Sequence, residues 1–191
     1  METMQATEKR PTLEDVWAIL NENARQMKVN EEKTNREMRK LSKIVGGLGN
    51  SIGELIETLI AARLWEKFSD FPYQFKRAYR RVQVFDDATN KELTDIDIML
   101  TDTEWVMAVE VKRDLVLKDV ERHIKRMKLI SEHPPAEAKN KKLLGAMAGG
   151  TIDPDAFNAA YETGFFVLEL KGESVELLAP PKGFKPKEWG L

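Results

Sequence analysis

The chain has 191 residues, of which 42% are hydrophobic and 32% charged, so it can bury a core while carrying an unusual amount of charge. Its formal net charge of −2 argues against a nucleic-acid binder that works through an overall positive field. The absence of cysteine excludes a disulfide framework, a thiolate zinc site and a cysteine nucleophile. The first residues have no apolar signal core and no apolar run approaches membrane-spanning length, so we expect a cytoplasmic protein with no membrane partner.

The segment from Thr12 to Val45 predicts one long exposed helix. Thr12 can cap its start, Asp15 stands at the third following position, and no proline or glycine interrupts it. Residues at seven-residue spacing are apolar with one interruption: Leu13, Leu20, Met27, Thr34 and Leu41. The companion positions make the heptad imperfect, being apolar at Val16 and Ile44 but polar at Asn23, Asn30 and Glu37. We expect a coiled-coil arm over residues 1–47 that forms a homo-oligomer through residues 12–45; packing of this helix on the rest of the chain is the alternative.

Residues 48–180 predict a separate domain, followed by a tail over residues 181–191. The glycine-rich stretch 46–53 predicts a hinge that ends the first helix, and Ser51 can cap a second helix that reaches Phe68. Beyond it we expect strands at 73–85, 94–100 and 104–112, a helix at 115–131, a strand at 141–150, a helix at 153–164, and strands at 165–171 and 174–180. The fold class is therefore α/β, a mixed β-sheet flanked by helices and preceded by a long N-terminal helix.

Two of the expected strands end in ionisable side chains. The segments DIDIML and EWVMAVEVK are joined by a short loop, so they should form an antiparallel hairpin. Because side chains alternate along a strand, Asp95 and Asp97 share one face, as do Glu110 and Lys112. The three acids and the lysine should meet at one edge of the sheet. A loop centred near residues 102–103 would place Asp95 opposite Glu110 and Asp97 diagonal to it.

Facing carboxylates repel each other unless a cation or a proton lies between them. With no cysteine and two histidines in the chain, an all-oxygen donor set suits Mg²⁺ or Mn²⁺. Lys112 would then offset charge beside the metal or position a water. The plainer interpretation is a salt bridge between Glu110 and Lys112 at the solvated end of a sheet. The acid on the preceding strand, the apolar walls and the glutamates upstream favour the metal site.

This combination resembles the PD-(D/E)XK nuclease superfamily, or restriction-endonuclease-like fold, whose pattern is an acid at the start of one strand and [D/E]-x-K at the end of the next. Here the pattern reads D-I-D-I-M-L and then A-V-E-V-K, with no proline before the aspartate. The resemblance spans residues 46 to about 170. The preceding helix and GGLGNSIGELIE resemble an uncharacterised prokaryotic subgroup that carries an N-terminal coiled coil.

The resemblance implies a metal-dependent endonuclease that hydrolyses phosphodiester bonds in nucleic acid, DNA by preference, with Mg²⁺ or Mn²⁺ as cofactor. It implies a set of site residues: Asp97, Glu110 and the backbone carbonyl of Val111 as metal ligands, Lys112 as the catalytic lysine, and Glu57 as support for the metal. Asp95 and Glu54 are competitors for the roles of Asp97 and Glu57. His123 is a secondary candidate, for which a surface position on a basic helix is the simpler expectation.

Local basic clusters would supply the contacts to nucleic acid, although each is individually typical of a solvated face. The candidates are Arg77, Arg80, Arg81, Arg113, Lys125 and Arg126. The alternative function is a catalytically silent nuclease-like module that binds or assembles through its coiled coil. A metal titration separates the two functions, because a silent module should bind neither ion at the acidic cluster.

Overall fold

The computed structural model describes residues 12–190. By its internal contacts the chain divides between Gly49 and Asn50 into two units. The first unit contains most of the helix α1 (Leu13–Ala61), and the second contains the end of α1 and every later element. Residues 1–11 of the predicted arm and Leu191 of the predicted tail lie outside the described residues.

The start of α1 has the predicted cap. The backbone N–H of Asp15 donates to Thr12 Oγ1 at 3.2 Å, and the backbone N–H of Thr12 donates to Asp15 Oδ2 at 2.8 Å. These reciprocal bonds satisfy backbone donors that the first turn of a helix leaves without partners. The predicted helix start is therefore confirmed.

The predicted hinge at residues 46–53 is wrong, because α1 passes through this stretch without interruption. The Ser51 cap of a second helix is wrong for the same reason. Each glycine lowers helix propensity by about 1 kcal/mol but blocks no helical backbone angle, and the stretch has no proline. A Cβ atom added at Gly46, Gly47 or Gly49 would meet no atom within 4 Å. The helix ends at Ala61, and the 3₁₀ helix η1 (Leu64–Phe68) replaces its predicted last turns.

The helix α1 also corrects the expectation about apolar runs. It contains a stretch with a mean hydropathy of 1.2, which by length and composition would be able to cross a membrane. This is weak evidence for a span. Ile56 and Ile60, near the end of the helix, instead pack in the core of the second unit.

The second unit is built on a six-stranded sheet in which spatial order follows chain order. The strands are β1 (Arg77–Phe85), β2 (Glu92–Thr101), β3 (Trp105–Leu115), β4 (Lys142–Ile152), β5 (Phe166–Lys171) and β6 (Ser174–Leu177). β4 pairs in parallel with β3 and β5, and the other neighbours pair antiparallel. The helices α2 (Leu117–Glu132) and α3 (Pro154–Thr163) connect the parallel strands, and the 3₁₀ helix η2 (Ala136–Ala138) follows α2. The mixed α/β class and the predicted order of strands and helices are confirmed.

The boundaries of the two connecting helices follow from local sequence. α2 ends at Glu132, before the two prolines that cannot continue it. Asp153 caps α3 by accepting a hydrogen bond from the backbone N–H of Asp155 at 2.9 Å, and Gly164 ends it with a φ of 90°. Both ends of α3 are as predicted.

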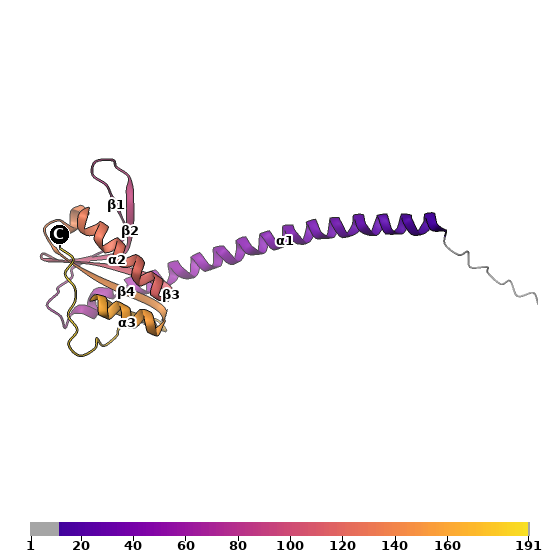
Figure 1. The fold of residues 1–191 in the computed structure, drawn as a ribbon. Helices are drawn as coiled ribbons and strands as arrows, with labels where there is room; N and C mark the ends of the chain where they lie inside the picture. The colour runs from indigo at the N-terminus through magenta and orange to yellow at the C-terminus, as the bar shows by residue number, and fades with distance from the viewer. Residues whose placement is uncertain (1–11, 191) are drawn as a thin grey trace, which may run out of the picture. The chain divides into compact units, whose positions relative to one another are not determined.

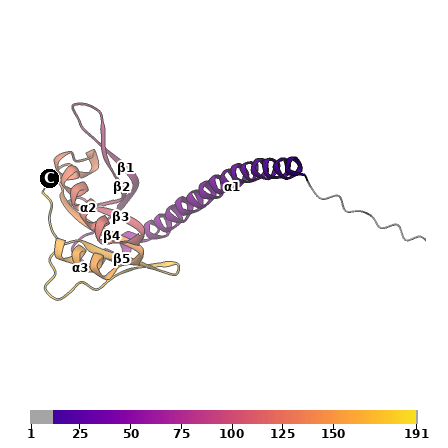
Figure 2. The ribbon, with the colours of Figure 1, turned by 45° about the vertical axis from the view of Figure 1, so that its right-hand side comes forward.

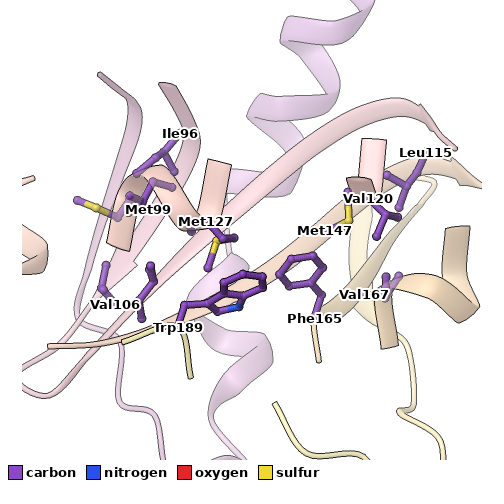
Figure 3. Packing of buried hydrophobic residues seen from close by; sticks show 14 of the residues in the cluster. Ile96, Met99, Val106, Leu115, Val120, Met127, Met147, Phe165, Val167 and Trp189 are labelled. Carbon is purple, nitrogen blue, oxygen red and sulfur yellow. The ribbon is translucent and has the colours of Figure 1, made fainter. Parts of the chain in front are cut away.

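The helices α2 and α3 cover one face of the sheet (Figure 1 and Figure 2). Their core includes Met127, Phe165 and Trp189 (Figure 3). The rings of Phe165 and Trp189 stack with centroids 5.6 Å apart, and the backbone N–H of Trp189 donates to the carbonyl of Leu143 at 2.9 Å. This part of the predicted tail is thus packed on the domain. A second core, on the other face of the sheet, includes Ile60 and Phe68.

Candidate active site

The β2–β3 hairpin brings Asp97 and Glu110 face to face. Ile98 pairs with Val109 and Thr101 with Val106, so the next two positions outward are Asp97 and Glu110. The predicted register, which set Asp95 opposite Glu110, is therefore wrong by two residues. The reason lies in the turn, where the Asp102 carboxylate accepts the backbone N–H groups of Glu104 at 2.8 Å and Trp105 at 2.7 Å. These bonds move the centre of the turn one residue along the chain.

The side-chain carboxylate of Asp97, instead of a backbone carbonyl of β2, accepts a backbone N–H of β3. Its Oδ2 atom accepts the backbone N–H of Val111 at 2.7 Å, just beyond the last paired residues of the two strands. Because the N–H and C=O of a strand residue point toward the same neighbour, the Val111 carbonyl also faces β2. Burial and the charge of Glu110 raise the pKa of Asp97 from 3.8 to about 6.

Glu110 is the most enclosed acid of the cluster, with its side chain 3% exposed. Lys112 Nζ lies 2.5 Å from Glu110 Oε1, and the guanidinium of Arg126 donates to Glu110 Oε2. Burial by itself would raise the pKa of Glu110, but the positive charges of Lys112 and Arg126 hold it below its usual value. Glu110 is thus an ionised carboxylate with two internal cations.

Arg126 belongs to this cluster, and its role as a nucleic-acid contact stays a prediction. Besides its bond to Glu110, its Nη2 atom lies 3.1 Å from Asp95 Oδ1. Asp95 is half exposed, and among the described residues its one side-chain ion pair is with this guanidinium. Arg126 therefore links the acid at the start of β2 to the acid on β3.

His123 is buried beneath Glu110, so the expected surface position is wrong. Its side chain is 2% exposed, its Nδ1 atom lies 3.9 Å from Glu110 Oε2, and its ring packs on Phe165 with centroids 4.9 Å apart. Burial lowers the pKa of His123 from 6.5 to about 4, so the imidazole is neutral at pH 7. The helical spacing from Val120 to His123 to Met127 is the sequence signal that identifies His123 as part of the buried stripe of α2.

The two glutamates of α1 make their ion pairs elsewhere. Arg80 donates to Glu57 Oε1 through Nε at 3.1 Å and Nη2 at 3.0 Å, and Arg81 Nη2 lies 3.1 Å from Glu54 Oε1. Among the described residues, neither glutamate pairs with Asp97, Glu110 or Lys112. Within residues 12–190 no ion pair therefore joins Glu57 or Glu54 to the strand cluster, and both glutamates are paired with Arg80 and Arg81.

Arg81 interrupts the regular pairing of β1 with β2 and has a left-handed backbone conformation. Arg80 pairs with Ile98 and Val82 with Ile96, so Arg81 stands between these pairs, beside Asp97. Its φ of 53° lies in the left-handed region, which a non-glycine residue adopts at an energetic cost. The irregularity of β1 thus coincides with the point where Asp97 leaves the regular β2–β3 ladder.

The remaining predicted basic contacts are scattered. Arg113 pairs with the adjacent Asp114 at 2.6 Å. Arg77 stands opposite Thr101, four residues along β2 from Asp97, or about 13 Å at 3.3 Å per residue. Lys125 is exposed beside the cluster and lines a groove of about 480 Å³ with Arg122, Arg126 and Asp95. Of the predicted basic residues, Lys125 and Arg126 are the two at this groove.

The donor chemistry of the cluster fits a hard divalent cation. Asp97, Glu110 and the Val111 carbonyl are all oxygen donors, and Mg²⁺ commonly takes one or two protein carboxylates and keeps several waters. Burial and the neighbouring Glu110 carboxylate raise the pKa of Asp97, and a cation between the two acids would relieve the repulsion. Within residues 12–190 no three histidine or acidic side chains are grouped to hold a metal by themselves. A cation here would therefore rely on two carboxylates, and Glu110 would have to exchange at least one of its ion pairs.

No protein-family model matches the sequence, and no curated protein matches it. Among solved structures, the chain is similar to a repair endonuclease from Pyrococcus abyssi, with 18% sequence identity and a TM-score of 0.41. The match covers 65% of this chain and 47% of that one, so this chain matches about half of the length of the other. At this identity and TM-score the similarity establishes no family, substrate or site.

Proposed function

We propose that the protein is a metal-dependent nuclease that hydrolyses phosphodiester bonds, with DNA as its substrate. The observation that carries this proposal is the meeting of Asp97, Glu110 and Lys112 where β2 and β3 separate. Their order along the chain, an acid on one strand and E-x-K on the next, is the pattern that resembles the PD-(D/E)XK nucleases.

In this proposal each residue has a separate task. Asp97, Glu110 and the Val111 carbonyl would hold Mg²⁺ or Mn²⁺. The bound ion would supply Lewis-acid polarisation of a phosphoryl oxygen and a lowered pKa for water. The ammonium of Lys112, already 2.5 Å from Glu110 Oε1, would stabilise negative charge that develops on the phosphate.

The groove between β2 and α2 would receive the substrate backbone. Arg122 and Lys125 line it, together with Arg126, whose planar guanidinium suits a phosphate as well as a carboxylate. Contacts of this kind carry no sequence information, and binding through them weakens as salt concentration rises. We therefore expect little sequence preference from this groove.

Cleavage of a DNA panel tests the proposal. Single-stranded, double-stranded and branched DNA, incubated with Mg²⁺ or Mn²⁺, should be cut by the wild-type protein but not by Asp97→Ala or Lys112→Ala. Lys171→Ala is the matched control, because Lys171 also pairs with a glutamate two residues before it but lies on β5 and is half exposed. If neither ion produces cleavage that these substitutions abolish, the proposal fails.

A catalytically silent module is the second candidate function. It is favoured by one observation, that both oxygens of Glu110 are already occupied by Lys112 and Arg126. Isothermal titration with Mn²⁺ distinguishes the two. A nuclease should release heat that Asp97→Ala removes, whereas a silent module should show no binding that depends on Asp97.

A further inference from the structure

One face of α1 is a nearly continuous apolar seam. Alternating steps of four and three residues from Leu13 reach positions that are all apolar except Glu31 and Thr34. The seam consists of Leu13, Trp17, Leu20, Ala24, Met27, Glu31, Thr34, Met38, Leu41, Val45, Leu48, Ile52 and Leu55. Its large apolar members are exposed, from 37% at Ile52 to 78% at Leu13. An apolar stripe sustained over about six heptads is the pattern of a coiled coil.

This seam is longer and more regular than the seven-residue pattern in residues 12–45. The second set of positions lies four residues after the first instead of three, so that Ala24 and Met38 take the places of the polar Asn23 and Glu37. Because α1 is continuous through residues 46–53, the stripe extends to Leu48 and Ile52. An isolated helix of this length with one exposed apolar face needs a partner to cover it.

We propose that α1 pairs antiparallel with α1 of a second copy of this chain, about a two-fold axis between Glu32 and Lys33. In this arrangement a residue of one copy lies level with the residue of the other copy for which the two residue numbers add up to 65. The nuclease proposal plays no part in this inference, which concerns the helix alone.

The composition of the layers favours this orientation. A parallel, in-register pair would set Glu31 against Glu31 of the second copy, two like charges within the seam. The antiparallel pair sets Glu31 against Thr34, so that both polar positions fall in the two central layers. The other layers between Leu13 and Ile52 are then apolar: Ala24 with Leu41, Leu20 with Val45, Trp17 with Leu48, Met27 with Met38, and Leu13 with Ile52.

The distribution of charge along α1 also favours the antiparallel orientation. From Leu13 to Glu32 there are five acidic and two basic side chains, a net charge of −3. From Lys33 to Val45 there are five basic side chains and one acidic, a net charge of +4. A parallel pair would bring like halves together, whereas the antiparallel pair lays each acidic half beside a basic half. The helix is thus complementary to itself only when one copy is reversed.

A direct consequence is the spacing of the two chains. Residue 50 of one copy is level with residue 15 of the other, so the two residues numbered 50 lie about 50 Å apart along the axis at 1.5 Å per residue. The chains would enter their second units at opposite ends of the paired helices.

Cysteine cross-linking of the full chain tests the proposal, since the natural sequence has no cysteine. Ala24→Cys and Leu41→Cys, carrying different affinity tags, are expressed singly and together and then oxidised. The antiparallel pair places the thiol of the Ala24→Cys copy against the thiol of the Leu41→Cys copy, within disulfide reach. It separates the thiols of two Ala24→Cys copies by about 25 Å. Gln26→Cys, on the outer face of the helix, is the matched control.

The expected result is a disulfide-linked dimer that contains both tags, formed in the mixture alone, with up to half of the chains linked. Sedimentation of the wild-type protein should give twice the mass of the chain. Cross-linking of Ala24→Cys with itself would show a parallel pair and overturn the proposal. A monomer, a higher oligomer without the mixed link, or association solely with a different protein would also overturn it.

Discussion

Asp97 and Glu110 occupy facing positions on β2 and β3, yet their environments shift their pKa values in opposite directions. Burial and the neighbouring carboxylate raise the pKa of Asp97, while Lys112 and Arg126 keep that of Glu110 low. Glu110 is thus already neutralised by internal cations, whereas Asp97 relies mainly on one backbone N–H. Ionised Asp97 is therefore the group that gains most from an added cation.

Replacing Asp97 by asparagine should stabilise the protein in EDTA at pH 8. The pKa of Asp97 rises from 3.8 to about 6 on folding, so its ionised form costs up to about 3 kcal/mol above pH 6, at 1.36 kcal/mol per pKa unit. This cost disappears as the pH falls from 6 to 3.8, because the folded protein then binds the proton. Urea unfolding should show a gain of about 1–3 kcal/mol at pH 8 and almost none at pH 4. Asp95→Asn, at a half-exposed carboxylate, is the control, and a loss of stability in Asp97→Asn at pH 8 would contradict the prediction.

Replacing His123 by methionine should remove a pH dependence of the opposite sign. The pKa of His123 is lowered from 6.5 to about 4, so the unfolded chain binds a proton more readily than the folded protein. The contribution of His123 is complete above pH 6.5 and is lost as the pH falls toward 4, by up to about 3 kcal/mol. His123→Met should therefore lose less stability than the wild type between pH 7 and pH 4.5, as measured by urea unfolding. Parallel pH profiles for the two proteins would show that His123 does not titrate in this way.

Removing the carboxylate of Glu110 should be strongly destabilising. Glu110→Gln leaves Lys112 and Arg126 without their shared anion in a site that is largely closed to water. Breaking one side of a buried ion pair typically costs about 3–5 kcal/mol, and the partial exposure of both cations reduces this to about 2–3 kcal/mol. Glu188→Gln is a suitable control, because Glu188 pairs with Lys142 at 3.4 Å with both side chains about half exposed. Urea unfolding at pH 7 should show a change below about 0.5 kcal/mol for the control.

Replacing Gly46 by alanine tests whether α1 is continuous through residues 46–53, and Gly164, which ends α3, is the contrasting position. Gly46→Ala should raise the free energy of unfolding by about 0.5–1 kcal/mol and increase helical circular dichroism, because the added Cβ meets no atom within 4 Å. Gly164→Ala should lower it by at least about 1 kcal/mol. That residue has a φ of 90°, and a Cβ would lie 2.7 Å from Lys187. Destabilisation by Gly46→Ala would favour the hinge that the sequence alone predicted.

Local patterns were sufficient to predict the sheet and the faces of its strands. Alternation along residues 95–100 and 104–112 correctly placed Asp97, Glu110 and Lys112 on one face, because this property depends only on the backbone of a single strand. The register depended on the Asp102 turn, whose side-chain bonds move the pairing by two residues. The amino-acid composition of a short loop does not determine which of its side chains bonds to the backbone, so it does not fix the register of the hairpin.

The contacts made by α2 and α1 required the assembled fold. Arg126 looked like one of several surface cations, and its position between Asp95 and Glu110 follows from how α2 packs on the sheet. Glu57 looked like a site acid, but Arg80, from a strand more than twenty residues later, pairs with it. Helical periodicity predicts a buried His123, whereas its basic neighbours on α2 favour a surface position, and the fold follows the periodicity.

Replacing Arg126 by glutamine should make the cluster a better cation site. The guanidinium already neutralises Glu110 and Asp95, so an incoming Mn²⁺ must displace it or bind beside its positive charge. We expect Arg126→Gln to bind Mn²⁺ about tenfold more tightly, a gain of about 1.4 kcal/mol, and to unfold at a lower temperature in EDTA. Isothermal titration at low ionic strength measures the first effect and thermal unfolding the second. Arg122→Gln, on the same helix and paired with Asp119 at 3.5 Å, should change neither. Weaker Mn²⁺ binding by Arg126→Gln would mean that the guanidinium supports the cation site instead of competing for it.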